Sequence, residues 1–167
     1  MELYILRHAI AVQRGTPGYE RDSERPLTPK GVKKMRAIAK GMQALGLDCD
    51  LFLSSPFPRA KETAEIVAKT FKALKKLKLS DTLAVGGDAA ELIDELNQTY
   101  NSYQSILLVG HEPYLSDLIS VLVAGDSQID VTMKKGGLCK LTASSLKYGR
   151  CATLDWLIAP RHLTRIR

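Results

Sequence analysis

The sequence predicts an α/β fold of three layers (α/β/α), with a mostly parallel central sheet and at least one antiparallel strand. Short apolar runs alternate with amphipathic stretches of helical length, and this alternation is typical of parallel sheets covered by helices on both faces. The last two apolar segments are joined by a short glycine-containing stretch, which favours an antiparallel hairpin. The 167 residues contain no repeat, linker or low-complexity segment, so we expect one domain over residues 1–167.

The first elements carry clear start and stop signals. Leu3–Leu6 is an uninterrupted apolar run, as expected of a buried strand. The following helix is predicted to begin with Thr28 as N-cap and Pro29 at its first position, and to end at Gly46. Asp50–Leu53 is the next predicted strand.

Two further helices are predicted from their capping signals. Ser55 and Pro56 are expected to cap a helix whose apolar positions recur with helical spacing as far as Phe71. Asp88 and Glu91 have the spacing of a capping box, which predicts that another helix starts there.

The C-terminal part alternates in the same way. Ser105–Val109 is the strongest strand signal, and Pro113 is predicted to start the helix after it. Leu138–Thr142 and Ala152–Ile158 are rich in strand-forming residues, and Lys147–Arg150 is expected to join them as a hairpin.

The composition is ordinary for a globular protein of the cytoplasm, where we expect this chain to reside. No apolar run is long enough to span a bilayer, and the N-terminus has no secretory signal. The three cysteines are odd in number and have no metal-ligand spacing, which argues against a disulfide framework or a zinc site. Cys49, Cys139 and Cys151 are therefore interpreted as buried free thiols.

The net charge of +6 favours anionic partners without choosing among them. The run Lys72–Lys78 could be a nucleic-acid patch, but it is interpreted as the solvated end of a helix, where cations offset the dipole. The aromatic content of 6% and the lack of an RNA-binding motif also argue against nucleic acid as a partner. A non-catalytic phosphate- or nucleic-acid-binding module remains the alternative of a different class.

Polar residues follow three predicted strands at the ends where α/β sheets bind ligands. Arg7 and His8 follow the first strand, Arg59 lies just after the second, and His111 and Glu112 follow the strand at 105–109. Two of the chain's three histidines thus lie at strand ends. Each residue alone is compatible with a structural role, but together they predict one common pocket.

Two imidazoles and two guanidiniums suit a phosphoryl group. The planar fork of arginine matches phosphate oxygens and stays charged. A neutral imidazole can attack phosphorus, and a second, protonated imidazole would stabilise charge on the transferring oxygens. The pattern therefore predicts phosphoryl transfer.

Three segments resemble the motifs of the histidine phosphatase (phosphoglycerate mutase-like) superfamily. Leu6–Ala9 resembles its Arg-His-Gly motif, with Ala9 in place of the usual glycine. Ser54–Ala60 with Thr63-Ala64 resembles its second block, and Val109–His111 its third. The resemblance implies a phosphoglycerate mutase-like fold. Ala9 is small enough for the pocket to survive, but it tolerates positive φ less well than glycine.

Arg25–Gly31, together with the Ser-Pro-Phe and Gly-His-Glu-Pro segments, is similar to the compact SixA-type phosphohistidine phosphatases. That resemblance implies that His8 is the nucleophile and that Arg7, Arg59 and His111 bind and activate phosphate. It also implies a metal-independent phosphatase that needs no cofactor and releases inorganic phosphate.

The sequence offers two candidate acids for the proton donor. Glu112 follows His111 directly and is favoured, although an acid near a helix start also has a structural explanation. Asp88 is the second candidate, but its role as N-cap already explains it. A site without a clear acid is the third possibility. Such a site would favour phosphoramidates, because a protonated imidazole leaves as a neutral group.

The compactness of the chain bears on the substrate. About 50 residues separate Arg59 from His111, which leaves little room for a lid. We therefore expect an open site on a monomer that acts on phosphohistidine in a signalling or phosphotransfer protein, with no nucleic-acid or membrane partner. A small-molecule phosphomonoesterase of the same superfamily is the alternative, and a mutase is less favoured. The segment Arg14–Glu24 is expected to form a loop at the mouth of the site, where the roles of Arg14, Arg21 and Arg25 are open.

Overall fold

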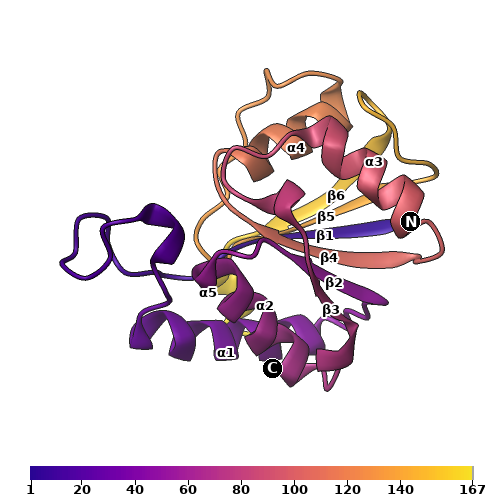
Figure 1. Ribbon diagram of the computed structural model, residues 1–167. Coiled ribbons are helices and arrows are strands. Elements are labelled where there is room, and N and C mark those ends of the chain that lie inside the picture. Colours follow the sequence, from indigo (N-terminus) through magenta and orange to yellow (C-terminus); the bar gives the residue numbers. More distant parts are fainter. Residues whose placement is uncertain (167) are drawn as a thin grey trace.

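The structure, a computed structural model, describes residues 1–166. Its middle layer is a six-stranded sheet with the order β3-β2-β4-β1-β5-β6 (Figure 1). The strands are β1 (Glu2–Arg7), β2 (Leu51–Ser54), β3 (Leu77–Leu79), β4 (Ser105–Gly110), β5 (Leu138–Ala143) and β6 (Ala152–Ile158).

The sheet is mixed, as predicted. β1 pairs in parallel with β4, and β2 pairs in parallel with both β3 and β4. β5 runs antiparallel to β1 and to β6, so the expected C-terminal hairpin is confirmed. The parallel register places Arg7 opposite Gly110 and Ser54 opposite Val109, so that β1, β2 and β4 end at the same edge of the sheet.

Helices cover both faces of the sheet. They are α1 (Pro29–Ala44), α2 (Pro58–Thr70), α3 (Ala89–Thr99), α4 (Tyr114–Ala124) and α5 (Pro160–Leu163). In Figure 1, α1, α2 and α5 lie on one face, while α3 and α4 lie on the other. The three-layer arrangement predicted from the sequence is therefore confirmed.

Side chains of the central strands alternate between two hydrophobic cores, one on each face of the sheet. Leu3 and Ile5 of β1 pack with the α3–α4 side, whereas Tyr4 and Leu6 pack with the α1–α2 side. Because both faces are covered, the strand is apolar without interruption rather than alternating with polar residues. Each fully buried leucine or isoleucine contributes roughly 1.5–3 kcal/mol, which holds the end of β1 in place.

The predicted helix starts are partly confirmed. Thr28 caps α1 by accepting a hydrogen bond from the amide of Gly31 at 3.0 Å, and Asp88 caps α3. The prediction that Ser55 caps α2 is wrong: α2 begins at Pro58, and Phe57 holds the N-cap position. The fixed φ of Pro58 suits the first helical position and sets the start three residues later than Ser55.

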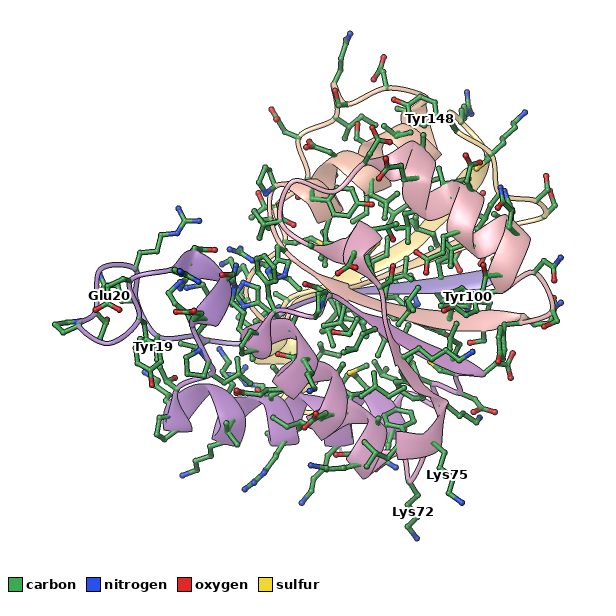
Figure 2. The ribbon with its side chains drawn as sticks, viewed as in Figure 1. Tyr19, Glu20, Lys72, Lys75, Tyr100 and Tyr148 are labelled. Atoms are coloured by element: carbon green, nitrogen blue, oxygen red, sulfur yellow. The ribbon has the colours of Figure 1, made fainter. Side chains whose placement is uncertain are left out.

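The interpretation of Lys72–Lys78 as the end of a helix is also wrong. Helix α2 ends at Thr70, Lys72 turns the chain with φ of 54°, and residues 77–79 form the edge strand β3. Lysine side chains are common on edge strands because they discourage pairing with other chains. Figure 2 shows Lys72 and Lys75 pointing away from the body of the molecule.

Cys49 and Cys139 are buried free thiols, as predicted, whereas Cys151 is half-buried. Burial raises the pKa of the Cys49 thiol to about 12, so that this thiol is uncharged. Within residues 1–166, no helix is both long and apolar enough to cross a membrane.

Candidate active site

The ends of three neighbouring strands bring the predicted residues together. The amide of His8 donates to the carbonyl of Gly110 at 3.0 Å, and the amide of Ser55 donates to the carbonyl of Val109 at 2.9 Å. These bonds continue the sheet ladder one residue beyond the strands. His8 and His111 consequently lie side by side, with ring centroids 5.2 Å apart.

A pocket of about 400 Å³ opens at this edge of the sheet. Its lining includes all five residues that the sequence singles out, which are Arg7, His8, Arg59, His111 and Glu112. The remaining lining residues come from loops and are Gln13, Arg14, Arg25, Val85 and Lys135. Among residues 1–166, no three His, Cys, Asp or Glu side chains form a group that could hold a metal ion.

His8 is held as a neutral ring with a defined tautomer. Its Nδ1 lies 2.7 Å from the carbonyl oxygen of Ala9, which can only accept, so Nδ1 carries the proton and Nε2 keeps a lone pair. Burial lowers the pKa of His8 to about 3; the bond to Ala9 acts against this shift, and His111 and Arg59 add to it. The ring is therefore unprotonated at Nε2 near pH 7, as a nucleophile requires.

His111 is fixed through its other nitrogen. Its Nε2 lies 2.8 Å from the hydroxyl of Ser55, which also accepts a hydrogen bond from the amide of Phe57 at 3.3 Å. Because that hydroxyl can donate its own proton to Nε2, Nδ1 is left as a donor. Burial, followed by the charge of Arg59, lowers the pKa of His111 to about 3. The ring is thus neutral, unlike the protonated imidazole expected from the sequence, but Nδ1–H can still donate.

The two arginines are anchored by their terminal nitrogens. Arg7 donates from Nη1 to the carbonyl of Met133 at 2.7 Å. Arg59 is only 2% exposed, and it donates to the Asp22 carbonyl from Nη1 at 2.6 Å and to the Asp22 carboxylate from Nη2 at 2.8 Å. Two hydrogen bonds fix the planar guanidinium of Arg59, and one restrains that of Arg7.

Four buried side-chain atoms without a hydrogen-bond partner occur in residues 1–166, and all four belong to residues that line the pocket. They are Nε of Arg7, Nε of Arg59, Nδ1 of His111 and Oε1 of Glu112. Each buried donor left unpaired costs about 1–3 kcal/mol, so a group of three calls for an explanation. A phosphoryl group has several acceptor oxygens and would satisfy all three donors.

The two candidate acids differ in position. Glu112 lines the pocket, and its other oxygen accepts a hydrogen bond from the hydroxyl of Ser116. Burial raises the pKa of the Glu112 carboxyl, although Ser116 and Arg7 act in the opposite direction. Asp88 is exposed at the start of α3, where its carboxylate accepts from the amide of Ala90 at 2.6 Å, and it is not part of the lining.

The loop between β1 and α1 forms one wall of the pocket, as the sequence predicts. In Figure 1 this loop, which contains the 3-10 turn η1 (Asp22–Glu24), projects from the body as an arm, and Figure 2 labels Tyr19 and Glu20 on it. Arg14 and Arg25 line the pocket, whereas Arg21 pairs with Glu24 at 3.7 Å outside the lining.

Two charged residues at the site are not predicted from the sequence. Asp22 accepts hydrogen bonds from Arg14, Arg25 and Arg59. Partial burial would raise the pKa of Asp22, but the hydrogen bonds from Arg14 and Arg25 outweigh it and hold that pKa well below its usual range. Asp22 therefore stays ionised and cannot serve as a proton donor.

Lys135 is the second missed residue. The segment that carries it is tied to the end of β1, because the amide of Gly136 donates to the carbonyl of Arg7 at 3.1 Å. Partial burial, together with the charges of Arg7 and Arg25, lowers the pKa of Lys135. The Lys-Lys-Gly-Gly segment at 134–137 was the only available signal, since paired glycines often mark a close backbone approach.

Ala9 fits its position without strain. Within residues 1–166, Lys72 is the only non-glycine residue with positive φ, so the backbone of Ala9 demands no glycine. The amide of Ala9 donates to the hydroxyl of Thr63 at 3.0 Å, and that hydroxyl donates to the carbonyl of Arg59 at 2.6 Å. Thr63 thereby links the segment carrying His8 to the helix carrying Arg59.

Comparisons with known proteins agree with this geometry. Residues 3–85 match the Histidine phosphatase superfamily (branch 1). An uncharacterized protein of Picosynechococcus is 32% identical over 148 residues, or 88% of each chain. The phosphohistidine phosphatase SixA of Escherichia coli is 25% identical over 164 residues, which cover 98% of this chain and 96% of that protein.

Solved structures give the same result. The protein histidine phosphatase SixA complexed with tungstate superposes with a TM-score of 0.82 at 26% identity, covering 98% of this chain and 99% of that one. The fold also matches a putative SixA from Agrobacterium tumefaciens, with a TM-score of 0.76 at 24% identity and coverage of 95% and 97%. The motifs, the pocket and these similarities together establish that the chain belongs to the histidine phosphatase superfamily and has a SixA-like fold.

Proposed function

We propose that this phosphatase removes phosphate from phosphohistidine on a signalling or phosphotransfer protein, through a phosphorylated His8 intermediate. The observation that carries the proposal is the set of three unpaired, buried N–H donors beside the neutral ring of His8. The names of the SixA relatives support phosphohistidine as the substrate class.

In the first step, Nε2 of His8 attacks phosphorus, and the P–N bond to the substrate imidazole breaks as the new P–N bond forms. Nε of Arg7, Nε of Arg59 and Nδ1 of His111 donate to the phosphoryl oxygens. Phosphoryl transfer depends mainly on positioning and on stabilising charge at these oxygens, which fixed donors provide without reorganisation. The leaving imidazole departs neutral once its nitrogen is protonated.

In the second step, water attacks phospho-His8, releasing inorganic phosphate and restoring the neutral ring. We assign both proton transfers to Glu112: its acid form donates to the leaving group, and the resulting carboxylate accepts the proton of the attacking water. The raised pKa of Glu112 supports this role. The guanidiniums supply the positive charge, and we expect no metal to be required.

The exposed residues at the mouth of the pocket favour a protein as the substrate. Arg14 and Lys135 line the pocket and are exposed, and Val85 is 43% exposed. The outer side of the pocket is therefore formed by exposed side chains on loops. A phosphohistidine displayed on another protein could enter from that side. A small-molecule phosphomonoesterase is the second candidate, because an acid in the pocket is what a poorer alkoxide leaving group needs.

Two further properties remain predictions from the sequence. We expect a monomer, which light scattering on the purified chain would report as a mass near 18.4 kDa. We also expect a cytoplasmic location, which fractionation of the source cells would test.

The test compares wild type with His8→Ala on a phosphohistidine protein and on p-nitrophenyl phosphate, both in excess chelator. His162→Ala is the matched control, because His162 is exposed on α5 and is not part of the pocket lining. We expect His8→Ala to be inactive, His162→Ala to be unaffected, and chelator to have no effect. Full activity in His8→Ala would contradict the mechanism, and no activity in wild type would favour a phosphate-binding module. Faster turnover of small phosphomonoesters than of phosphohistidine would favour the second candidate.

A further inference from the structure

The carboxylate of Asp22 is the hub of an arginine cluster beside the pocket. Its Oδ1 accepts from Nε of Arg14 at 2.7 Å, and from Nε and Nη2 of Arg25 at 3.1 and 2.6 Å. Its Oδ2 accepts from Nη2 of Arg59 at 2.8 Å. One loop carboxylate thus connects the arm to an arginine of the inner pocket.

Asp22 determines which part of Arg59 is available to an anion. Both terminal nitrogens of Arg59 donate to Asp22, one to its carbonyl and one to its carboxylate. Because the guanidinium is planar, fixing these two nitrogens also fixes the direction of the Nε–H bond. Nε is the nitrogen of Arg59 that is buried without a partner.

Arg25 holds Asp22 from the other side. It is only 8% exposed, and all three of its side-chain nitrogens are used: two donate to Asp22 and Nη1 donates to the carbonyl of Val12 at 2.5 Å. Arg14 contributes less, because its side chain is 76% exposed and solvent screens its charge. The buried pair Arg25 and Arg59 therefore clamps Asp22 in place.

We propose that Asp22 is a positioning residue for phosphate binding, acting through Arg59. It holds the guanidinium from the side of the arm so that Nε–H is directed to a phosphoryl oxygen. This inference rests on the proposed function of the pocket as a phosphoryl site. A carboxylate near an anion site would ordinarily weaken anion binding by repulsion, so the proposal predicts an effect opposite in sign to simple electrostatics.

The test is the affinity of Asp22→Asn for tungstate and for inorganic phosphate, measured by calorimetry. The amide keeps the size of the side chain but loses the charge that holds Arg59. We expect binding to weaken about 10- to 100-fold, as for loss of a charge-assisted hydrogen bond network. Glu24→Gln, in the same 3-10 turn, is the control and should bind as wild type, because Glu24 is exposed and pairs with exposed Arg21. Tighter anion binding in Asp22→Asn would overturn the proposal.

A double-mutant cycle separates positioning from a general loss of structure. In an Arg59→Ala background, Asp22→Asn should cause no further loss of affinity, because its effect passes through Arg59. An equal loss in both backgrounds would contradict the proposal. Asp22→Glu, which keeps the charge, should recover part of the affinity even if Asp22→Asn lowers the melting temperature. Since these assays measure anion binding, they remain decisive even if phosphohistidine is not the substrate.

Discussion

The pocket has two walls that are built differently. The inner wall consists of Arg7, His8, Arg59 and His111, which lie at strand ends or in the first turn of a helix. Hydrogen bonds hold these side chains to other segments of the chain or, for His8, to the adjacent Ala9. The outer wall consists of Gln13, Arg14, Val85 and Lys135, which lie on three separate loops.

The difference assigns different tasks to the two walls. Transfer of a phosphoryl group requires donors fixed within a fraction of an ångström, and rigid elements with supporting hydrogen bonds supply that precision. Recognition of a partner surface tolerates, and often uses, adaptable loops. We therefore expect substitutions in the inner wall to affect every substrate strongly, and those in the outer wall to affect protein substrates selectively and weakly.

Apart from loss of the nucleophile itself, the largest effect is expected for His111→Ala. It removes the Nδ1–H donor beside His8, and loss of one such donor typically lowers kcat by about 100- to 1,000-fold. Turnover of p-nitrophenyl phosphate and of a phosphohistidine protein should fall alike, because both transfer the same phosphoryl group. A loss confined to one of the two substrates would show that His111 recognises the substrate rather than the transferring oxygens.

The two walls also differ in how well the sequence predicts them. Arg7, His8, Arg59 and His111 directly follow apolar strand signals or lie in a helix start, so local pattern and the strand-end rule suffice to bring them together. Asp22 and Lys135 lie in irregular segments whose paths depend on tertiary bonds, such as the one from Gly136 to the end of β1. No local periodicity encodes such bonds.

Errors in the prediction of the fold have similar causes. The Ser-Pro signal at Ser55 is the same whether the hydroxyl caps a helix or bonds a distant residue, and here it bonds His111, which is 56 positions away in the sequence. Strand β3 was missed because three residues, two of them leucines around Lys78, are too few for a period to be recognised. The central strands were predicted well because burial on both faces leaves a continuous apolar run.

An intermediate effect is expected for Glu112→Gln, which lies between the walls and tests the proton donor. The neutral amide should lower kcat/KM for an alkyl phosphomonoester, whose alkoxide leaving group needs a proton, about 100-fold, at the low end of what general acids contribute. The loss should be smaller for phosphohistidine, whose leaving group needs less help. Equal losses for the two substrates would indicate that Glu112 acts by charge alone.

The pH dependence sharpens the same test. His8 and His111 have pKa values of about 3 in the free enzyme, so both rings remain neutral from pH 7 down to pH 5 and create no change in rate there. The acid form of Glu112 is lost as pH rises through its raised pKa, so wild-type kcat/KM should fall as the pH rises above that pKa. The ratio of wild type to Glu112→Gln at each pH cancels the ionisation of the substrate. A ratio independent of pH would contradict the assignment.

The smallest effect is expected for Lys135→Met, in the outer wall. Methionine keeps the apolar length of the side chain but removes the charge, and Lys135 is exposed. We expect p-nitrophenyl phosphate turnover to change less than about twofold and kcat/KM for a phosphohistidine protein to fall about 3- to 10-fold at low salt, with the difference shrinking at high salt, because rim charges act mainly on association. Lys134→Met is the matched control, since Lys134 is the exposed neighbour of Lys135 and is not part of the pocket lining. An equal loss on both substrates would place Lys135 with the inner wall, where its charge would act on the phosphoryl group itself.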